Sequence, residues 1–352
     1  EFQFNTAFGS DITLEQLKAE GFEAFFFAIG AHHSFKLGVP GESDFPQVKQ
    51  AVDFLRNVAL GDRQVPGKHA VVIGGGNVAI DAARTCLRLG CESVTLAYRR
   101  TRSEMPADTE EVEQAEEEGI RFEFLNIPSE IIGSRGQLEG LRCLKAKLIS
   151  KEGQDRKYPV PIEDSEYIIG ADVIICAIGQ RVNETCLESL KGLAWTRRNT
   201  INVNMATMES SLEGVFAAGD AVTGPATVIE AIGGGKRAAE SIDRWLSGIP
   251  QPSMPPVPTR RGRVDYLEVP AITKMTLKRP EIPLLNIDRR RTTFQQVELG
   301  HTENMVREEA RRCLRCDICL RCGKCVEVCR DRMKVDALQM GYFDFDHPVE
   351  TD

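Results

Sequence analysis

The sequence predicts an α/β fold of the doubly wound type, with a small cysteine-rich segment near its C-terminal end. Three observations predict it. Residues 69–98 read as a strand, a glycine turn, a helix and a second strand, which is typical of a parallel sheet. An apolar strand at 172–177 and a strand followed by a helix between 214 and 245 continue that alternation. Six of the eleven cysteines then follow within 313–329.

The composition indicates a folded chain of two or more domains. Of its 352 residues, 42% are hydrophobic and 27% charged, as in ordinary globular domains. Lys and Arg number 44 against 52 Asp and Glu, and the net charge of −8 argues against nucleic acid as the main partner. No apolar run approaches the roughly 20 residues that span a bilayer, and the acidic first residues do not resemble a secretory signal. We therefore expect no membrane span and a cytoplasmic location.

The first sixty residues predict a helix, a buried strand and a second helix. Apolar spacing predicts helices over 13–20 and 45–60, and the run 24–28 predicts a buried strand. A loop rich in Gly and Pro separates the strand from the second helix, and His32 and His33 are expected to face solvent there. This arrangement is typical of the middle of a domain.

The central part predicts one half of a nucleotide-binding sheet. Strands at 69–73 and 93–98 flank a helix over 77–89, with Gly90 just past its end. The strand at 172–177 returns to this domain and closes it. Between them, three alternating segments predict a small antiparallel meander, at 122–125, 130–132 and 138–149.

The last third predicts a strand pair, a long helix and a linker. The strand at 214–220 precedes a helix over 227–245, which contains three consecutive glycines at 233–235. Each of these weakens a helix by roughly 1 kcal/mol relative to alanine, so close backbone packing is their expected benefit. Five prolines within 250–258 mark an extended linker, and a helix over 302–312 precedes the cysteine cluster.

A glycine-rich turn joins the first strand of the central sheet to its helix. The turn runs through Gly74, Gly75, Gly76, Asn77 and Val78, and with Ala79 it makes a GxGxxA pattern. Gly74 permits the tight turn, Gly76 lets the backbone approach a pyrophosphate, and Ala79 lets helix and strand pack closely. The helix N-terminus then presents free N–H groups to the phosphates. The turn predicts a bound dinucleotide; the alternative is a purely structural turn.

Two arginines stand where an NAD-binding domain would carry an acidic residue. Arg99 and Arg100 directly follow Tyr98, and the first carboxylate after them is Glu104. An NAD ribose would lack its hydrogen-bond acceptor here, whereas guanidinium groups suit a 2′-phosphate. The sequence therefore favours NADP(H). The alternative is that both arginines belong to a solvated loop.

Gly219 and Asp220 at the end of a buried strand indicate half of a flavin site. A carboxylate there can bind a ribityl hydroxyl of a flavin. The amides of the helix that opens at Thr227 can stabilise negative charge on the reduced ring. The alternative is that Asp220 is only a turn or cap residue.

The C-terminal cysteines have the spacing of an iron–sulfur motif. Cys319-x2-Cys322-x2-Cys325-x3-Cys329 matches the bacterial ferredoxin spacing for a [4Fe–4S] cluster, with Arg330 where that motif has proline. Cys313 and Cys316 can supply a further ligand. Two CxxC pairs also suit a Cys₄ zinc site, which is the alternative. The other five cysteines are expected to be packing residues. Arginines that either offset cluster charge or form a solvated face are Arg307, Arg311, Arg312, Arg315 and Arg321.

Over residues 1–248 the sequence resembles the two-dinucleotide-binding flavoproteins, in particular the NADPH-dependent small subunit of glutamate synthase. The segments that carry the resemblance are Ala28-Ile29-Gly30, 71–90 with 98–107, Ala177-Ile178-Gly179-Gln180 and 215–239. The resemblance implies a Rossmann-like NADP domain inserted in an FAD domain. It also implies that Gly75 to Val78 contact the NADPH phosphates and that Arg99 with Arg100 contact the 2′-phosphate. The same resemblance places Ala177, Ile178 and Gly179 beside the nicotinamide, and Ala28, Ile29, Gly30, Gly219, Asp220 and Thr227 among the cofactor-binding residues.

The sequence departs from this family at its start. Family members open with their own GxGxxG turn for FAD, and this chain has one such turn, at Gly74. We expect a fragment of a longer protein, or a flavin site that another subunit completes. The expected domains are a partial FAD domain (1–60), an NAD(P)H domain (61–185), a return to the FAD domain (186–248), a linker (249–300) and an iron–sulfur segment (301–352).

The pattern as a whole favours an oxidoreductase module that passes electrons between NADP(H), FAD and a [4Fe–4S] cluster. No side chain is predicted to act as a catalyst, because protein groups mainly position such cofactors. The resemblance implies another redox subunit or domain as partner, glutamate synthase large-subunit-like or a ferredoxin-like acceptor. The alternative is a noncatalytic assembly subunit with a degenerate flavin site and a structural metal, zinc or iron–sulfur.

Overall fold

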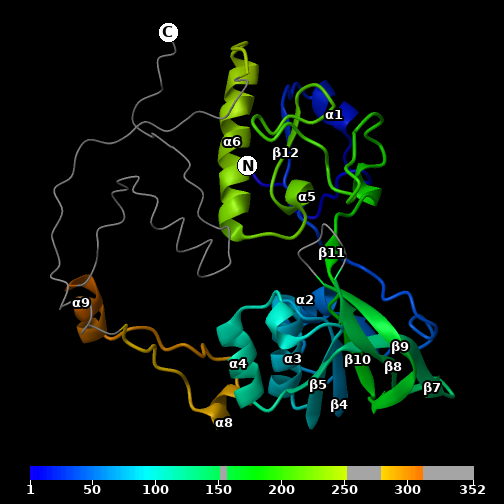
Figure 1. Ribbon diagram of the computed structural model, residues 1–352. Coiled ribbons are helices and arrows are strands. Elements are labelled where there is room, and N and C mark those ends of the chain that lie inside the picture. Colours follow the sequence, from blue (N-terminus) through cyan, green and yellow to red (C-terminus); the bar gives the residue numbers. More distant parts are fainter. Residues whose placement is uncertain (151–156, 252–278, 312–352) are drawn as a thin grey trace. The chain divides into compact units, whose positions relative to one another are not determined.

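The computed structural model describes residues 1–150, 157–251 and 279–311 (Figure 1). Glu1–Ile249 and Asn286–Gln295 form one compact unit, and the remaining described residues belong to a second. None of the helices in these ranges combines the length and apolar character that a bilayer-spanning segment needs.

A five-stranded parallel sheet carries the glycine turn. Its order is β3-β10-β4-β5-β6, with bounds Val48–Gln50, Val173–Cys176, His69–Ile73, Ser93–Tyr98 and Arg121–Phe124. The structure confirms β4, β5, β10 and the helix between β4 and β5, α3 (Asn77–Leu89), which ends at Gly90 with φ +107°. β5 follows β4 directly, whereas β10 returns from far along the chain to the other side of β4. The strand order therefore reverses at β4, which is where open α/β sheets bind ligands.

Two sequence predictions for this sheet are wrong. The helix predicted over 45–60 begins only at Ala51, as α2 (Ala51–Ala59), and the residues before it form the edge strand β3 beside β10. The segment 122–125 does not belong to the meander, because β6 pairs in parallel with β5. Both segments are too short for their hydrophobic periodicity to determine the secondary structure, so pairing with a neighbouring strand determines it.

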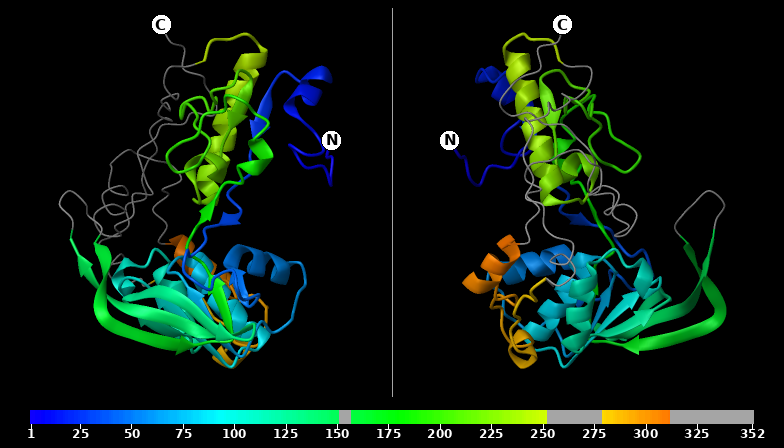
Figure 2. Two further views of the ribbon diagram at one scale, coloured as in Figure 1. Left: turned by 90° about the vertical axis from the view of Figure 1, so that its right-hand side faces the viewer. Right: turned by 60° about the vertical axis from the view of Figure 1, so that its left-hand side comes forward.

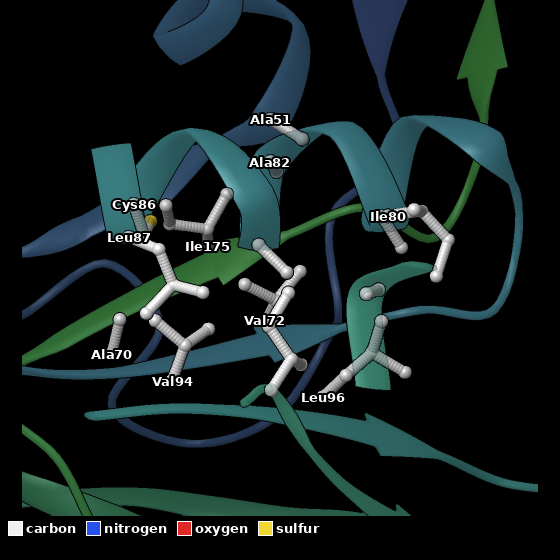
Figure 3. Close-up of a cluster of buried hydrophobic side chains, with 14 of the residues drawn as sticks. Ala51, Ala70, Val72, Ile80, Ala82, Cys86, Leu87, Val94, Leu96 and Ile175 are labelled. Atoms are coloured by element: carbon white, nitrogen blue, oxygen red, sulfur yellow. The ribbon is translucent and has the colours of Figure 1, made fainter. Parts of the chain in front are cut away.

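Both faces of the sheet are buried, which explains why its strands are continuous apolar runs. Ala70 and Val72 of β4 face the helices α2, α3 and α4 (Thr109–Glu117), and Figure 3 shows this layer with Cys86 and Leu87 of α3. On the opposite face, Val71 and its neighbours pack against the antiparallel sheet β7-β8-β9. Its long strands, drawn in Figure 2, are Asn126–Ser134, Gln137–Ile149 and Tyr158–Gly170.

A second core surrounds a two-stranded parallel pair, β1 (Phe25–Phe27) and β12 (Val215–Ala217). The helices of this part are α1 (Leu14–Ala19), α5 (Asp220–Thr223) and α6 (Val228–Leu246), and the 3₁₀ turn Thr185–Leu187 packs on the same core. A second 3₁₀ turn, Arg102–Glu104, follows β5. Thr227 caps α6, as the predicted helix start requires. Among the three glycines of α6, Gly234 is the one that packs closely, because a Cβ there would lie 3.0 Å from that of Ala218. Close packing therefore accounts for one glycine of the three.

A short antiparallel ribbon pairs β2 (His33–Ser34) with β11 (Gln180–Arg181). His32 and His33 are exposed, as predicted. The ribbon joins the segments that lead out of β1 and out of β10, so two stretches about 150 residues apart in the sequence lie side by side.

Part of the predicted linker contacts the first unit. α8 (Ile287–Arg290) places the buried side chain of Arg290 2.9 Å from Glu117 of α4, and Arg63 lies over the Phe294 ring at 4.5 Å. In the second unit, α9 (Glu303–Arg311) confirms the helix predicted before the cysteines.

Candidate functional site

Gly74 begins the turn at the carboxyl end of β4. Its φ is +153°, and a Cβ there would lie 2.4 Å from the carbonyl oxygen of Ala177, the residue after β10. Its N–H donates to the Ala97 carbonyl of β5 at 3.0 Å. Packing between two neighbouring strands therefore requires glycine at this position.

The next two glycines differ in what requires them. A Cβ at Gly75 would lie 2.4 Å from the Tyr98 ring, whose hydroxyl donates to the Glu104 carbonyl at 2.9 Å. Gly76 has φ −95°, which any residue adopts, and the nearest atom to its Cβ position is Cγ of Pro106 at 3.9 Å. Protein packing thus requires Gly75 but leaves the space at Gly76 open. A dinucleotide whose pyrophosphate approaches the backbone fits this open space.

Backbone donors gather at the same turn. In the part of the chain that the structure describes, no group accepts a hydrogen bond from the N–H groups of Gly75, Gly76, Asn77 and Val78. Val78 and Asn77 open α3, so the positive end of the helix dipole adds to these donors. Four free amides at a helix N-terminus form a site suited to phosphate.

A loop that sequence reasoning did not assign closes over the turn. The N–H of Ala107 donates to the Gly75 carbonyl at 3.2 Å, and the N–H of Asp108 donates to Oδ1 of Asn77 at 2.8 Å. The side chain of Asn77 is therefore engaged by the protein, and its backbone N–H is what remains for a ligand. The signal in the sequence was Asp108 followed by acidic residues, a helix N-cap pattern, since its Oδ1 accepts from Glu110.

The structure separates the two arginines. Arg99 is exposed, whereas Arg100 is only 6% exposed, because adjacent residues of an extended chain point in opposite directions. The carbonyl of Arg100 accepts from the N–H of Leu125 at 3.1 Å, but its buried Nε has no hydrogen-bond partner among the described residues. A buried guanidinium donor without a partner is costly, and a phosphate oxygen is a fitting acceptor. Arg102 differs, because it pairs with Glu116 of α4.

The segments predicted beside the nicotinamide meet at the ribbon. Gly30, with φ +67°, precedes β2, and Gly179, with φ +123°, precedes β11. The Phe35 N–H donates to the Gly179 carbonyl at 3.1 Å. Ala177 contacts the glycine turn as described above, and Ile178 is 38% exposed. The structure thus places Ala177 beside the glycine turn and Gly179 beside Phe35, which follows the segment of Ala28, Ile29 and Gly30 in the sequence.

The predicted flavin residues are engaged in local hydrogen bonds. Asp220 opens α5 after Gly219 (φ +68°), and its Oδ1 accepts from the Ala226 N–H at 3.3 Å. Thr227 forms a capping box with Glu230: its hydroxyl accepts from the Glu230 N–H, and the Glu230 carboxylate accepts from Thr227. The backbone N–H and hydroxyl of Thr227 lower the pKa of Glu230. Asp220 and Thr227 therefore do act as turn and cap residues. Among the described residues no group accepts a hydrogen bond from the N–H groups of Val228 and Ile229, so both can serve an anion.

The five scattered cysteines lie in or against the hydrophobic cores. Cys86, Cys91, Cys143 and Cys176 are buried, and Cys186 is half-buried. Burial raises the pKa of Cys143 and of Cys176 to about 12, so both are neutral thiols at ordinary pH. The six clustered cysteines, Cys313 to Cys329, lie outside the described residues. Within those residues no three His, Cys, Asp or Glu side chains gather as a metal site would require.

Comparison with known proteins agrees with this geometry. The family model for pyridine nucleotide-disulphide oxidoreductases matches residues 6–235. The chain belongs to the pyridine nucleotide-disulphide oxidoreductase family. Within 89% of its length it is 36% identical to NADPH-Fe(3+) oxidoreductase subunit beta of Geobacter sulfurreducens, covering 51% of that protein. Over the same share it is 38% identical to NADP(+)-dependent formate dehydrogenase subunit beta of Moorella thermoacetica, covering 45% of it. The chain thus spans about half the length of these relatives.

Two further matches concern the resemblance and the fold. The small chain of Escherichia coli glutamate synthase [NADPH] is 30% identical over 70% of this chain and is covered to 55%. This confirms the resemblance that the sequence motifs indicate. The structure of Mycobacterium tuberculosis FprA in complex with NADPH aligns with a TM-score of 0.56, at 21% identity, over 69% of this chain and 68% of that one. The fold of this oxidoreductase family is therefore confirmed.

Proposed function

We propose that the chain is an electron-transfer module that binds NADP(H) at the turn of Gly74 to Val78 and exchanges electrons with a flavin and an iron–sulfur cluster. The observation that carries the proposal is the turn itself. Its four free amides and the open space at Gly76 serve no packing purpose in the protein, and both suit a pyrophosphate.

Two parts of the domain hold the nucleotide, the glycine turn and the end of β5. The N–H groups of Gly75 to Val78 bind its phosphates, and Arg99 with Arg100 bind the 2′-phosphate at the end of β5. The buried Nε of Arg100 gains its partner there. Ala177, Ile178 and Gly179 line the nicotinamide side of the site. The exposed apolar side chain of Ile178 excludes water from the bound nicotinamide. When bound, the nicotinamide supplies or accepts a hydride.

The flavin part of the site uses the second core. Asp220 holds a ribityl hydroxyl, the N-terminal amides of α6 after Thr227 stabilise negative charge, and Ala28, Ile29, Gly30 and Gly219 line the backbone approach. This is half of an FAD site, because the one glycine turn of the GxGxxA type in the sequence, at Gly74, belongs to the NADP part. Residues 1–60 and 186–248 form this part, and residues 61–185 form the NADP part.

The clustered cysteines hold a [4Fe–4S] cluster in the segment 301–352, after the linker of 249–300. Their spacing supports this, with Cys319, Cys322, Cys325 and Cys329 as ligands and Cys313 with Cys316 as further candidates. A cluster bound by these cysteines would supply one-electron transfer, and a second redox subunit or domain in the cytoplasm would be its partner. Two of the relatives are named as beta subunits, which supports a partner of this kind.

Nucleotide titration of arginine variants tests the nucleotide assignment. The dissociation constants of NADPH and NADH are measured by protein fluorescence for the wild type, Arg99→Ala, Arg100→Ala and the double variant. We expect the double variant to lose NADPH affinity by tenfold or more relative to any loss for NADH. Arg121→Ala is the matched control, because this exposed arginine lies at the amino end of β6, the opposite edge of the sheet. Equal losses for the two nucleotides would remove the basis for a 2′-phosphate site.

A visible spectrum of protein purified without oxygen tests the electron path. We expect a brown chromophore that dithionite bleaches and, after incubation of the protein with FAD, flavin absorbance that NADPH bleaches. A colourless protein that contains zinc would instead support the noncatalytic alternative.

A further inference from the structure

Two cysteines meet at the C-terminal end of α3. The helix ends in a Schellman motif, in which the N–H of Cys91 donates to the carbonyl of Cys86 at 3.1 Å and the N–H of Gly90 donates to Leu87 at 2.9 Å. In this motif the residue after the left-handed glycine contacts the residue five positions earlier, a contact that is usually between apolar side chains. Here both positions are cysteine, so the cap places two thiols together.

The two side chains also share one core. Both residues lie in the hydrophobic cluster beneath α3, where Figure 3 labels Cys86, and each thiol shifts the pKa of the other. Cys86 is fully buried and Cys91 is 6% exposed, but Cys91 lies between the exposed residues Gly90 and Glu92. Cys91 therefore lies next to the surface along the chain, whereas Cys86 lies within the helix.

The pair is chemically unequal. The neighbouring Cys86 thiol lowers the pKa of Cys91 against the effect of burial, and the backbone N–H of Gly67 acts in the same direction. The neighbouring Cys91 thiol together with burial raises the pKa of Cys86 well above its usual range. The thiolate is the reactive form of cysteine. Cys91 is therefore the nucleophile of the pair, and Cys86 is the resolving cysteine.

We propose that Cys86 and Cys91 are a peroxide-sensitive dithiol that closes to an intrachain disulfide. The Cys91 thiolate attacks one oxygen of hydrogen peroxide, the O–O bond breaks, and Cys91 becomes a sulfenic acid while water leaves after protonation. The Cys86 sulfur then attacks the Cys91 sulfur, the S–O bond breaks, and a second water leaves with the Cys86 proton. The two sulfurs lose two electrons in total and peroxide is reduced to two waters. A small dithiol such as dithiothreitol reverses the bond.

The position of this pair makes it distinct from the nucleotide site. α3 begins at the glycine turn and ends at Cys86 and Cys91, so the whole helix separates the two. Cys143 offers a contrast, since burial raises the pKa of its thiol to about 12 and the thiol donates a hydrogen bond to the Leu141 carbonyl rather than to another described cysteine. The sequence gives no sign of the pair beyond its spacing, because the contact arises from the cap geometry.

Peptide mapping of the full chain tests the proposal. Reduced protein is treated with a few equivalents of hydrogen peroxide, unfolded in guanidinium with N-ethylmaleimide, and digested with trypsin. Cleavage after Arg84, Arg88 and Arg99 places the two cysteines on separate peptides, 85–88 and 89–99. Because only these peptides are scored, oxidation of the cysteines at 313–329 does not affect the reading.

We expect most of the two peptides to appear as one joined species, two hydrogen masses below their sum, that separates on reduction. Cys86→Ala and Cys91→Ala each abolish it, and Cys143→Ala, the matched control, does not. The proposal is overturned if both peptides are recovered with N-ethylmaleimide, if Cys91 passes to sulfinic or sulfonic acid without joining, or if it joins another cysteine. The wild-type digest alone shows either the joined peptides or one of the three contrary results, so the test does not depend on the folding of the variants.

Discussion

Replacing Gly76 with alanine separates ligand binding from folding. Gly76 has φ −95° and ψ 176°, an ordinary extended conformation, and its Cβ would meet no atom closer than 3.9 Å. A glycine-to-alanine change at such a position stabilises by roughly 0.4–1 kcal/mol through the unfolded chain, while alanine is a poorer N-cap than glycine by a similar amount. The free energy of unfolding should therefore stay within about 1 kcal/mol of the wild type.

Binding should respond differently. The new methyl group lies where the pyrophosphate approaches the amides of Asn77 and Val78, so the phosphate loses at least one charge-assisted hydrogen bond. Such a bond contributes about 1.5–3 kcal/mol, which corresponds to a loss of affinity of roughly tenfold to a hundredfold. Urea unfolding gives the first quantity and fluorescence titration with NADPH gives the second.

Two neighbouring variants complete this experiment. Gly75→Ala brings a Cβ to 2.4 Å from the Tyr98 ring and should destabilise the fold by about 1–3 kcal/mol. Gly170→Ala, in open space at the end of β9, should leave both quantities unchanged. Wild-type NADPH affinity in a stable Gly76→Ala protein would refute the reasoning, because the open space at Gly76 would then serve no ligand.

Further predictions concern the elements that hold the site. Glu118 is fully buried and bonded to Arg84 and Arg88 of α3 at 2.7 and 2.9 Å, so Glu118→Gln should lower the free energy of urea unfolding by about 3 kcal/mol; a loss below 1 kcal/mol would contradict this. Burial opposes the charge of Glu118, but the two guanidinium groups hold its pKa below the usual 4.5. The ionised Glu118 therefore stabilises the fold above about pH 4.5, and this stabilisation is lost as the pH falls through the lowered pKa. Acid unfolding should accordingly be steeper in the wild type than in Glu118→Gln, and parallel curves would argue against it. Thr227→Ala removes the capping box of α6 and should cost about 1 kcal/mol in thermal unfolding, with an unchanged midpoint as the contrary result.

The central nucleotide unit follows from the sequence because its signals are local. β4, α3, Gly90 and β5 lie where the apolar runs, the glycine turn and the C-terminal glycine place them. The failures lie where pairing with distant segments decides. β3 is three residues long and becomes a strand only beside β10, and β6 lies directly before the antiparallel sheet in the sequence but takes β5 as its partner.

The candidate site was predictable in its backbone and less so in its side chains. The turn at Gly74 was found because a glycine pattern reports backbone geometry directly. That Arg100 is buried while Arg99 is exposed depends on where β5 ends, and the closure of Ala107 and Asp108 over the turn depends on hydrogen bonds that no residue period encodes. The thiol pair of Cys86 and Cys91 arises in the same way, from the geometry of a helix cap.

Calorimetric titration of the wild-type chain with NADP⁺ and with NAD⁺ tests the central claim most directly. Free amides at the turn and an unpartnered guanidinium at the end of β5 predict one NADP⁺ bound per chain, at least tenfold more tightly than NAD⁺, with adenosine 2′,5′-bisphosphate competing for the site. Equal affinities, or no binding heat with either nucleotide, would contradict the account.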